Sequence, residues 1–217
     1  TADIEKAAKD IVAGASFDNN LPCIAEKECF VFNSVADELI SYMTANGAYL
    51  VNKEQRDRIM SFCLINKEGK YVINKKWVGK DARLFLKEIG IDADPRLIIC
   101  EADEMHPFVQ TEMMMPVLPI VRVNNIDEAI DMAVKAEHGC RHSAHIHSKN
   151  VERLTRFARE VETTIFVKNA PSYAGIGAGG EGHTTFTIAG PTGEGLTSAR
   201  SFTRQRRCVL AEGFHIV

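Results

Sequence analysis

Apolar residues along this chain follow two alternating patterns, a helical spacing and short continuous runs. Residues 2–13 show the first pattern, and their apolar positions form one face of a predicted amphipathic helix. Residues 28–32 show the second pattern and predict a strand. Further on, helices are predicted near 34–43, 53–65, 81–89, 125–134 and 149–162, and strands at 48–51, 97–100, 116–123, 143–147 and 164–169.

Strands that alternate with helices indicate an α/β fold, in which an open, largely parallel sheet is flanked by helices. Two helix starts are marked by polar residues that can cap a helix. Ser34 has Asp37 three residues later, and Asn125 has Glu128 at the same spacing. We therefore expect a helix to begin at each of these two sites.

Three stretches depart from this alternation. Residues 66–81 are mixed and rich in lysine, and they predict irregular structure or a surface hairpin. Glycines gather in the region 175–195, which predicts a long loop region. A β-like tail is expected after it, at residues 207–210.

Composition narrows the class of protein. The 217 residues carry a net charge of −3, which gives no electrostatic reason for binding nucleic acid or an anionic membrane surface. No apolar run is long enough to cross a bilayer, and no secretory signal pattern is present. The cysteines form no CxxC pair, so we expect free thiols in a reducing cytoplasm. They are Cys23, Cys29, Cys63, Cys100, Cys140 and Cys208.

Cys23 is the residue with the clearest chemical potential. It lies in the polar, turn-prone stretch 17–26, directly after the first predicted helix, where a thiol can meet a substrate. Such a cysteine can act as a nucleophile if backbone N–H groups or cations stabilise its thiolate. A small buried hydrophobe is the alternative for a free cysteine.

Two patterns suggest ligand sites but lack their usual context. Gly175, Gly177 and Gly180 match G-x-G-x-x-G, yet a β-like segment follows where a dinucleotide site needs a helix. A flexible or pocket-lining loop is favoured there, and the glycines of 190–195 lack the lysine of a phosphate loop. The segment 137–147 holds four histidines and a cysteine, but no second ligand pair at zinc spacing. We expect solvated histidines on a strand, one or two of them near an active site, and no metal.

Glu112 stands beside three methionines in a loop before a predicted strand. Its carboxylate could bind a pair of ligand hydroxyls or be solvated, and the residue types alone do not separate these roles. The methionines, Met114 among them, are typical of core packing.

Taken together, several segments resemble the aldehyde dehydrogenase superfamily, in particular the CoA-acylating aldehyde dehydrogenases of ethanolamine and propanediol utilisation. Residues 16–25 look like the family's nucleophile loop, and 112–119 look like its Glu-x-Phe-Gly-Pro motif. Residues 125–139 resemble the helix that follows that motif. The segments 179–189 and 203–210 resemble the acylating branch in particular, and the likeness runs over essentially the whole chain.

The resemblance implies a role for four residues. Cys23 would be the nucleophile that forms an acyl thioester, which CoA then accepts. Glu112 would hold the nicotinamide ribose of NAD. Met114 stands where many relatives have a phenylalanine against that ribose, so its packing role would be altered. His142 is a candidate base for thiolate formation or CoA deprotonation.

The resemblance also implies a division of labour along a longer protein. The family's Rossmann-like cofactor domain would precede residue 1, so 1–203 are expected to be the catalytic domain and 204–217 a C-terminal tail or oligomerisation strand. The isolated chain is then not expected to turn over NAD. The implied partners are CoA and a short-chain aldehyde, acetaldehyde or propionaldehyde. The resemblance also implies a homodimer or homotetramer. Its location would be the cytoplasm or the interior of a bacterial microcompartment, where it could associate with the shell or with other cargo proteins.

Two rival interpretations stay open. The chain could be the aldehyde half of a bifunctional aldehyde–alcohol dehydrogenase, although Leu21-Pro22 before Cys23 argues against this. It could also be a non-catalytic assembly domain whose cysteine is structural. Iodoacetamide separates the second rival from an enzyme, because a catalytic Cys23 is expected to alkylate well before the other five thiols.

Overall fold

The computed structural model describes residues 1–187, 196–209 and 211. The strands are β1 (Cys29–Phe32), β2 (Ala48–Val51), β3 (Leu64–Lys67), β4 (Lys70–Ile73), β5 (Leu97–Glu101), β6 (Val117–Val123), β7 (Ser143–Ile146) and β8 (Ile165–Lys168). The helices are α1 (Ile4–Ala15), α2 (Asn33–Ala45), α3 (Lys53–Cys63), α4 (Ala82–Glu88), α5 (Pro107–Gln110), α6 (Ile126–Ala136) and α7 (Val151–Val161). Short 3-10 helices are η1 (Phe17–Asn20), η2 (Ser172–Ile176) and η3 (Ala199–Phe202).

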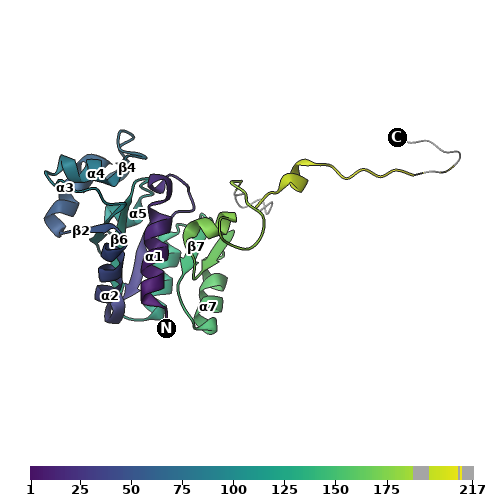
Figure 1. Ribbon diagram of the computed structural model, residues 1–217, viewed down its shortest axis with the longest axis horizontal. Helices are drawn as coiled ribbons and strands as arrows, with labels where there is room; N and C mark the ends of the chain where they lie inside the picture. The colour runs from purple at the N-terminus through teal and green to yellow at the C-terminus, as the bar shows by residue number, and fades with distance from the viewer. Residues whose placement is uncertain (188–195, 210, 212–217) are drawn as a thin grey trace.

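Four strands form the central sheet in the order β1-β6-β5-β2, and every neighbouring pair is parallel. A separate two-stranded sheet, β7 with β8, is also parallel and lies to one side of α1 (Figure 1). The predicted α/β fold with an open, parallel sheet flanked by helices is therefore confirmed. Among the described residues, no helix is both long and apolar enough to cross a bilayer.

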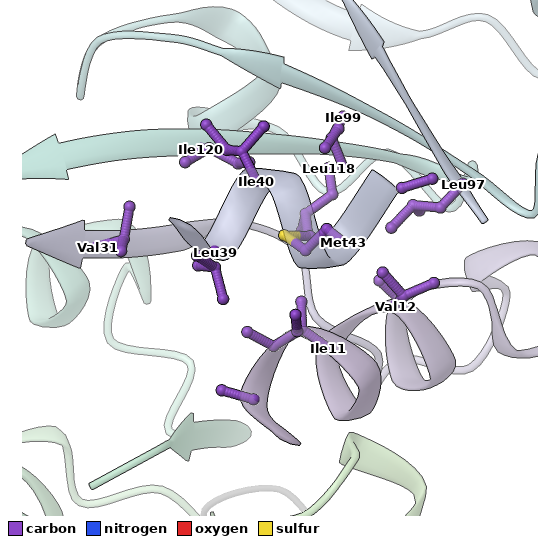
Figure 2. Packing of buried hydrophobic residues seen from close by; sticks show 14 of the residues in the cluster. Ile11, Val12, Val31, Leu39, Ile40, Met43, Leu97, Ile99, Leu118 and Ile120 are labelled. Atoms are coloured by element: carbon purple, nitrogen blue, oxygen red, sulfur yellow. The ribbon is translucent and has the colours of Figure 1, made fainter. Parts of the chain in front are cut away.

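Helices cover both faces of the central sheet. On one face, α1 and α2 bury Val12 and Met43 against β5 and β6 (Figure 2). On the other face, α3, α4 and α5 enclose a second cluster that includes Phe85. Leu97 of β5 joins the first cluster and Ile98 joins the second. Strand β5 is apolar from Leu97 to Cys100, where both of its faces are buried, and it ends at the exposed Glu101.

The central strand β6 contains a proline, which removes one backbone donor. Ile98 and Ala102 donate to the carbonyls of Pro116 and Ile120, so the even-numbered residues of β6 pair with β5. The missing amide of Pro119 therefore faces the β1 side of the strand. Pairing with β1 begins only at Ile120, one residue later, so no ladder hydrogen bond is lost. This register explains how the predicted strand tolerates its proline.

Some predicted boundaries were wrong. Asn125 caps α6 by accepting from the Glu128 amide at 3.0 Å, as predicted, but α2 begins at Asn33 and Ser34 does not cap it. The helix expected over 53–65 ends at Cys63, because Leu64 pairs with β4. Of the two options predicted for 66–81, irregular structure or a surface hairpin, a hairpin is present as β3 and β4, but it begins two residues earlier, at Leu64. The four-residue α5 was not foreseen.

The C-terminal segment runs away from the body of the molecule (Figure 1). Residues 203–209 are exposed and pair with no strand in the described part of the chain. The β-like tail expected at 207–210 is therefore not paired within the described residues, and its last residue lies outside them. A role in oligomerisation stays a prediction.

Candidate active site

Cys23 is exposed on a tight turn whose next residue anchors it in the core. The turn is closed by the Ala25 amide, which donates to the Pro22 carbonyl at 2.9 Å. Ile24 is 1% exposed and packs with Ile165 of β8. One side chain thus fixes the turn while its neighbour presents the thiol to solvent.

The backbone before Cys23 turns through three consecutive left-handed residues. Asp18, Asn19 and Asn20 have φ values of 46°, 54° and 63°. Asn and Asp tolerate this region better than other side chains, which accounts for the Asp-Asn-Asn sequence. The distinctive composition of the loop is therefore a backbone requirement.

Asn20 closes the loop that carries Cys23. Its buried Nδ2 donates to the carbonyl of Ala15, at the end of α1, and to the carbonyl of Glu26, both at 2.9 Å. The side-chain amide of Asn20 thus contacts the backbone at both ends of the loop. Because both ends are held by one side chain, the position of Cys23 relative to α1 is fixed.

A second loop, which carries Glu112 and Met114, is tied to the first through Gly79. Asn19 Nδ2 donates to the Gly79 carbonyl at 3.1 Å, and the Gly79 amide donates to the Met114 carbonyl at 3.0 Å. Gly79 has a φ of +68°, and a Cβ there would lie 3.1 Å from the Leu21 methyl groups. The glycine therefore lets both loops meet.

This arrangement brings the charge of Glu112 into electrostatic reach of Cys23. Partial burial raises the pKa of the Cys23 thiol, Glu112 raises it further, and a backbone hydrogen bond at Cys23 lowers it. Glu112 itself is exposed, and Met114 is half-buried with a φ of 52°. From the sequence, a nearby cation could have stabilised the thiolate. Among the described residues, however, the side-chain charge that acts on Cys23 is a carboxylate.

Exposure alone does not single out Cys23 among the thiols. Cys140 and Cys208 are also exposed, whereas Cys63 and Cys100 are buried. Burial raises the pKa of Cys100 to about 12. What distinguishes Cys23 from the other exposed thiols is therefore its clamped loop and the nearby Glu112 carboxylate.

His142 lies just before β7. Its ring Nδ1 is 3.1 Å from the Ser143 hydroxyl, and its backbone amide donates to Glu137 at 2.9 Å. Within the described residues, no hydrogen bond joins His142 to Cys23 or Glu112. Its role as a base stays a prediction.

The expectation of solvated histidines on the following strand was wrong for two of them. His145 and His147 are half-buried, and the Nε2 atom of each is buried without a hydrogen-bond partner. Burial lowers the pKa of His145 to about 4, and neighbouring histidines add to this. Among the described residues, no group of three or more histidine, cysteine, aspartate or glutamate side chains could hold a metal ion.

The G-x-G-x-x-G match is a packing feature, and the expected flexible or pocket-lining loop was wrong for Gly175, which lies within η2. A Cβ at Gly175 would overlap Ile165, and a Cβ at Gly177 would lie 2.6 Å from the His183 carbonyl oxygen. Gly177 closes η2 rather than opening a helix. The second glycine cluster, 190–195, lies outside the described residues.

Sequence reasoning missed the residues that hold the loops together. The double role of Asn20 was not foreseen, although the Asn-Asn pair beside Cys23 was a signal for it. Gly79 lies in the stretch predicted to be irregular, and no sequence signal ties it to Cys23. Glu26, which the structure buries, lies in the stretch predicted to be polar and turn-prone, and nothing in the sequence marks it as buried.

Comparison with known proteins gives a consistent set of relatives. A model of the aldehyde dehydrogenase family matches residues 1–197. The acetylating acetaldehyde dehydrogenase EutE of Escherichia coli is 49% identical over 221 residues, covering 100% of this chain and 47% of its own length. The chain thus spans about half the length of the curated relatives that it matches.

Solved structures agree. The propionaldehyde dehydrogenase of Rhodopseudomonas palustris, with bound CoA and an acylated cysteine, is 53% identical with a TM-score of 0.90, covering 97% of this chain and 48% of that one. A propionaldehyde dehydrogenase from the fucose utilisation microcompartment of Clostridium phytofermentans is 54% identical, with the same TM-score and the same two coverages.

Proposed function

Because the chain belongs to the aldehyde dehydrogenase family, we propose that it supplies the catalytic part of a CoA-acylating aldehyde dehydrogenase that converts a short-chain aldehyde to acyl-CoA. The observation that carries this proposal is the exposed Cys23 on a loop clamped by Asn20, with Glu112 in electrostatic reach. An acylated cysteine in a similar structure supports it.

In the proposed reaction, the Cys23 thiol loses its proton and its Sγ adds to the aldehyde carbon. The Cys23 backbone N–H is a candidate donor to the oxyanion that forms. Hydride then leaves that carbon, which is thereby oxidised to the acyl level, and a thioester on Cys23 remains. The CoA thiol loses its proton and attacks the thioester. The new carbon–sulfur bond to CoA forms as the bond to Cys23 breaks, so the net proton released is that of CoA.

A nicotinamide cofactor would supply the hydride acceptor. The residues present fit only part of such a group. Glu112 is an exposed carboxylate in reach of Cys23, and a carboxylate can accept from a pair of ribose hydroxyls. Met114, half-buried in the same loop, would pack nearby. Gly175, Gly177 and Gly180 are committed to packing, so we propose that the pyrophosphate and adenosine contacts come from another part of a longer protein, with NAD as the cofactor.

His142 is the proposed base for the thiol protons. Its ring is half-buried and contacts the Ser143 hydroxyl, which can fix the tautomer. This proposal needs a base because burial and Glu112 both disfavour the Cys23 thiolate.

The substrate and setting follow from the relatives. We propose acetaldehyde or propionaldehyde as the substrate. The relative of 49% identity is named an acetaldehyde dehydrogenase, and the relative of 53% identity is named a propionaldehyde dehydrogenase. We propose a location in the cytoplasm or inside a bacterial microcompartment, because one relative comes from such a compartment. A homo-oligomer is proposed because the family resemblance implies one.

The test replaces Cys23 by Ser in the intact protein, with Cys140→Ser as a matched control for an exposed thiol. Acyl-CoA formation from propionaldehyde, CoA and NAD should fall to background in the first variant and stay normal in the second. Normal turnover by Cys23→Ser would overturn the proposal.

A further inference from the structure

Glu26 is a buried carboxyl group that the proposed reaction does not use. The residue is 6% exposed, and it directly follows the turn that presents Cys23. Oε1 accepts a hydrogen bond from the Ser172 amide at 3.0 Å, whereas Oε2 is buried and has no partner. Burying a carboxyl group with an unpaired oxygen costs free energy, so its presence in this loop needs an explanation.

The carboxyl group sits in a space that one helix leaves open. Gly14 belongs to the last turn of α1, and a Cβ built there would overlap both carboxyl oxygens of Glu26 and their carbon. The same glutamate offers its backbone carbonyl to Asn20 at 2.9 Å. Glu26 therefore links three segments: the Cys23 loop, α1 and the start of η2.

We propose that Glu26 is a positioning residue for Cys23, whose carboxyl group, seated against Gly14 and bound to the Ser172 amide, fixes the downstream end of the nucleophile turn. This inference rests on the proposed role of Cys23. Asn20 holds the upstream and downstream backbone together, and Glu26 holds the downstream end to the β8–η2 connection. If the Glu26 carboxyl moved, the Cys23 thiol, only three residues away, would move with it.

The protonation of Glu26 is sensitive to its surroundings. Burial raises its pKa to about 7, the neighbouring Ser172 side chain and amide lower it, and Asp10 on α1 raises it. Asp10 is itself paired with Lys6 and lies 4.0 Å from His147 Nδ1. On β1, Glu26 contributes to the raised pKa of the Cys29 thiol. Asp10 and Cys29 are therefore the titratable groups that interact with the Glu26 carboxyl, and its protonation can change near neutral pH.

The test measures the alkylation rate of Cys23 by iodoacetamide against pH in the intact protein, with mass spectrometry to assign the thiol. Glu26→Ala removes the carboxyl, and Gly14→Ala displaces it without removing it. Each should change the rate constant at Cys23 about tenfold or more, because small misplacements have large effects on reactivity. Cys140, exposed and outside the loop, is the internal control and should not change.

Two further variants separate positioning from other roles. Glu26→Gln keeps an acceptor for the Ser172 amide, so its rate constant for alkylation of Cys23 near pH 7 should be close to that of the unaltered protein. Its pH profile should lack the inflection that Glu26 ionisation adds. The double variant Gly14→Ala with Glu26→Ala should be less impaired than the product of the two single effects, because the new methyl group enters the vacated space.

Unchanged alkylation of Cys23 in Gly14→Ala and Glu26→Ala would overturn the inference, and so would a Gln variant as impaired as the Ala variant. If Glu26→Ala does not fold, the Gly14→Ala and Gln results decide. Alkylation needs no aldehyde, CoA or cofactor. A positive result together with normal turnover of Cys23→Ser would thus reject the proposed function and keep the positioning role.

Discussion

Replacing Asn20 by Ala should open the loop that carries Cys23. One Nδ2 group holds the carbonyls of Ala15 and Glu26 at 2.9 Å each. Leaving a buried acceptor without its donor costs about 1–3 kcal/mol. The residue also has a φ of 63°, a region that costs an alanine roughly 1–2 kcal/mol. Allowing for partial rescue by water, we expect a loss of about 2–5 kcal/mol in the free energy of unfolding.

The hydrogen-bond and backbone contributions can be separated. Asn20→Gly loses the same hydrogen bonds but tolerates the left-handed backbone, so it should be about 1 kcal/mol less damaging than Asn20→Ala. Asn46→Ala is a matched control. Its amide donates to the Tyr42 carbonyl at 2.8 Å from a residue with a φ of −92°, and its loss should cost about 1 kcal/mol.

Urea unfolding followed by circular dichroism measures these differences as shifts in midpoint. A loss below about 0.5 kcal/mol for Asn20→Ala, the size of an ordinary surface substitution, would refute the clamp. A glycine variant more damaging than the alanine variant would refute the backbone part of the reasoning.

Three other results are expected. Gly175→Ala should lower stability by about 1–3 kcal/mol in the same urea assay, because the new methyl group would overlap Ile165; an unchanged midpoint would show that η2 can shift freely. Brief iodoacetamide treatment of the native protein should modify the exposed thiols and spare the buried ones, Cys63 and Cys100, and peptide mapping that finds these two labelled would contradict the described core. Burial raises the pKa of Glu28 from 4.5 to about 7, so the folded state keeps a proton that the unfolded state has lost, and stability should fall as pH rises through this range. Glu28→Gln should flatten that fall in thermal midpoints measured from pH 5 to 8, and an equally steep profile would contradict this.

The sheet could be predicted from the sequence because its strands are marked by burial on both faces. Strand β5 is apolar up to its last residue, and α6 carries both an apolar stripe and the Asn125 cap. The end of α3 at Cys63 could not be predicted, because Leu64 pairs with Ile73, its antiparallel partner nine residues later, and this pairing overrides local propensity. Tertiary pairing decided that segment.

The site divides in the same way. Cys23, Glu112 and their loops were marked by unusual residue combinations, and the structure brings their charges within reach of each other. The links through Gly79 and Ser172 depend on residues about 60 and 146 positions away from their partners. No local pattern encodes such contacts, and a glycine or a backbone amide carries no chemical label in a sequence.

The central claim, an acyl group carried on Cys23, can be tested directly by trapping. The intact protein is incubated with propionaldehyde and NAD in the absence of CoA, digested, and examined by mass spectrometry. The account predicts one propanoyl group on the peptide that contains Cys23, which disappears when CoA is added and propanoyl-CoA forms. An unmodified Cys23 peptide under conditions in which acyl-CoA is still produced on adding CoA would contradict it.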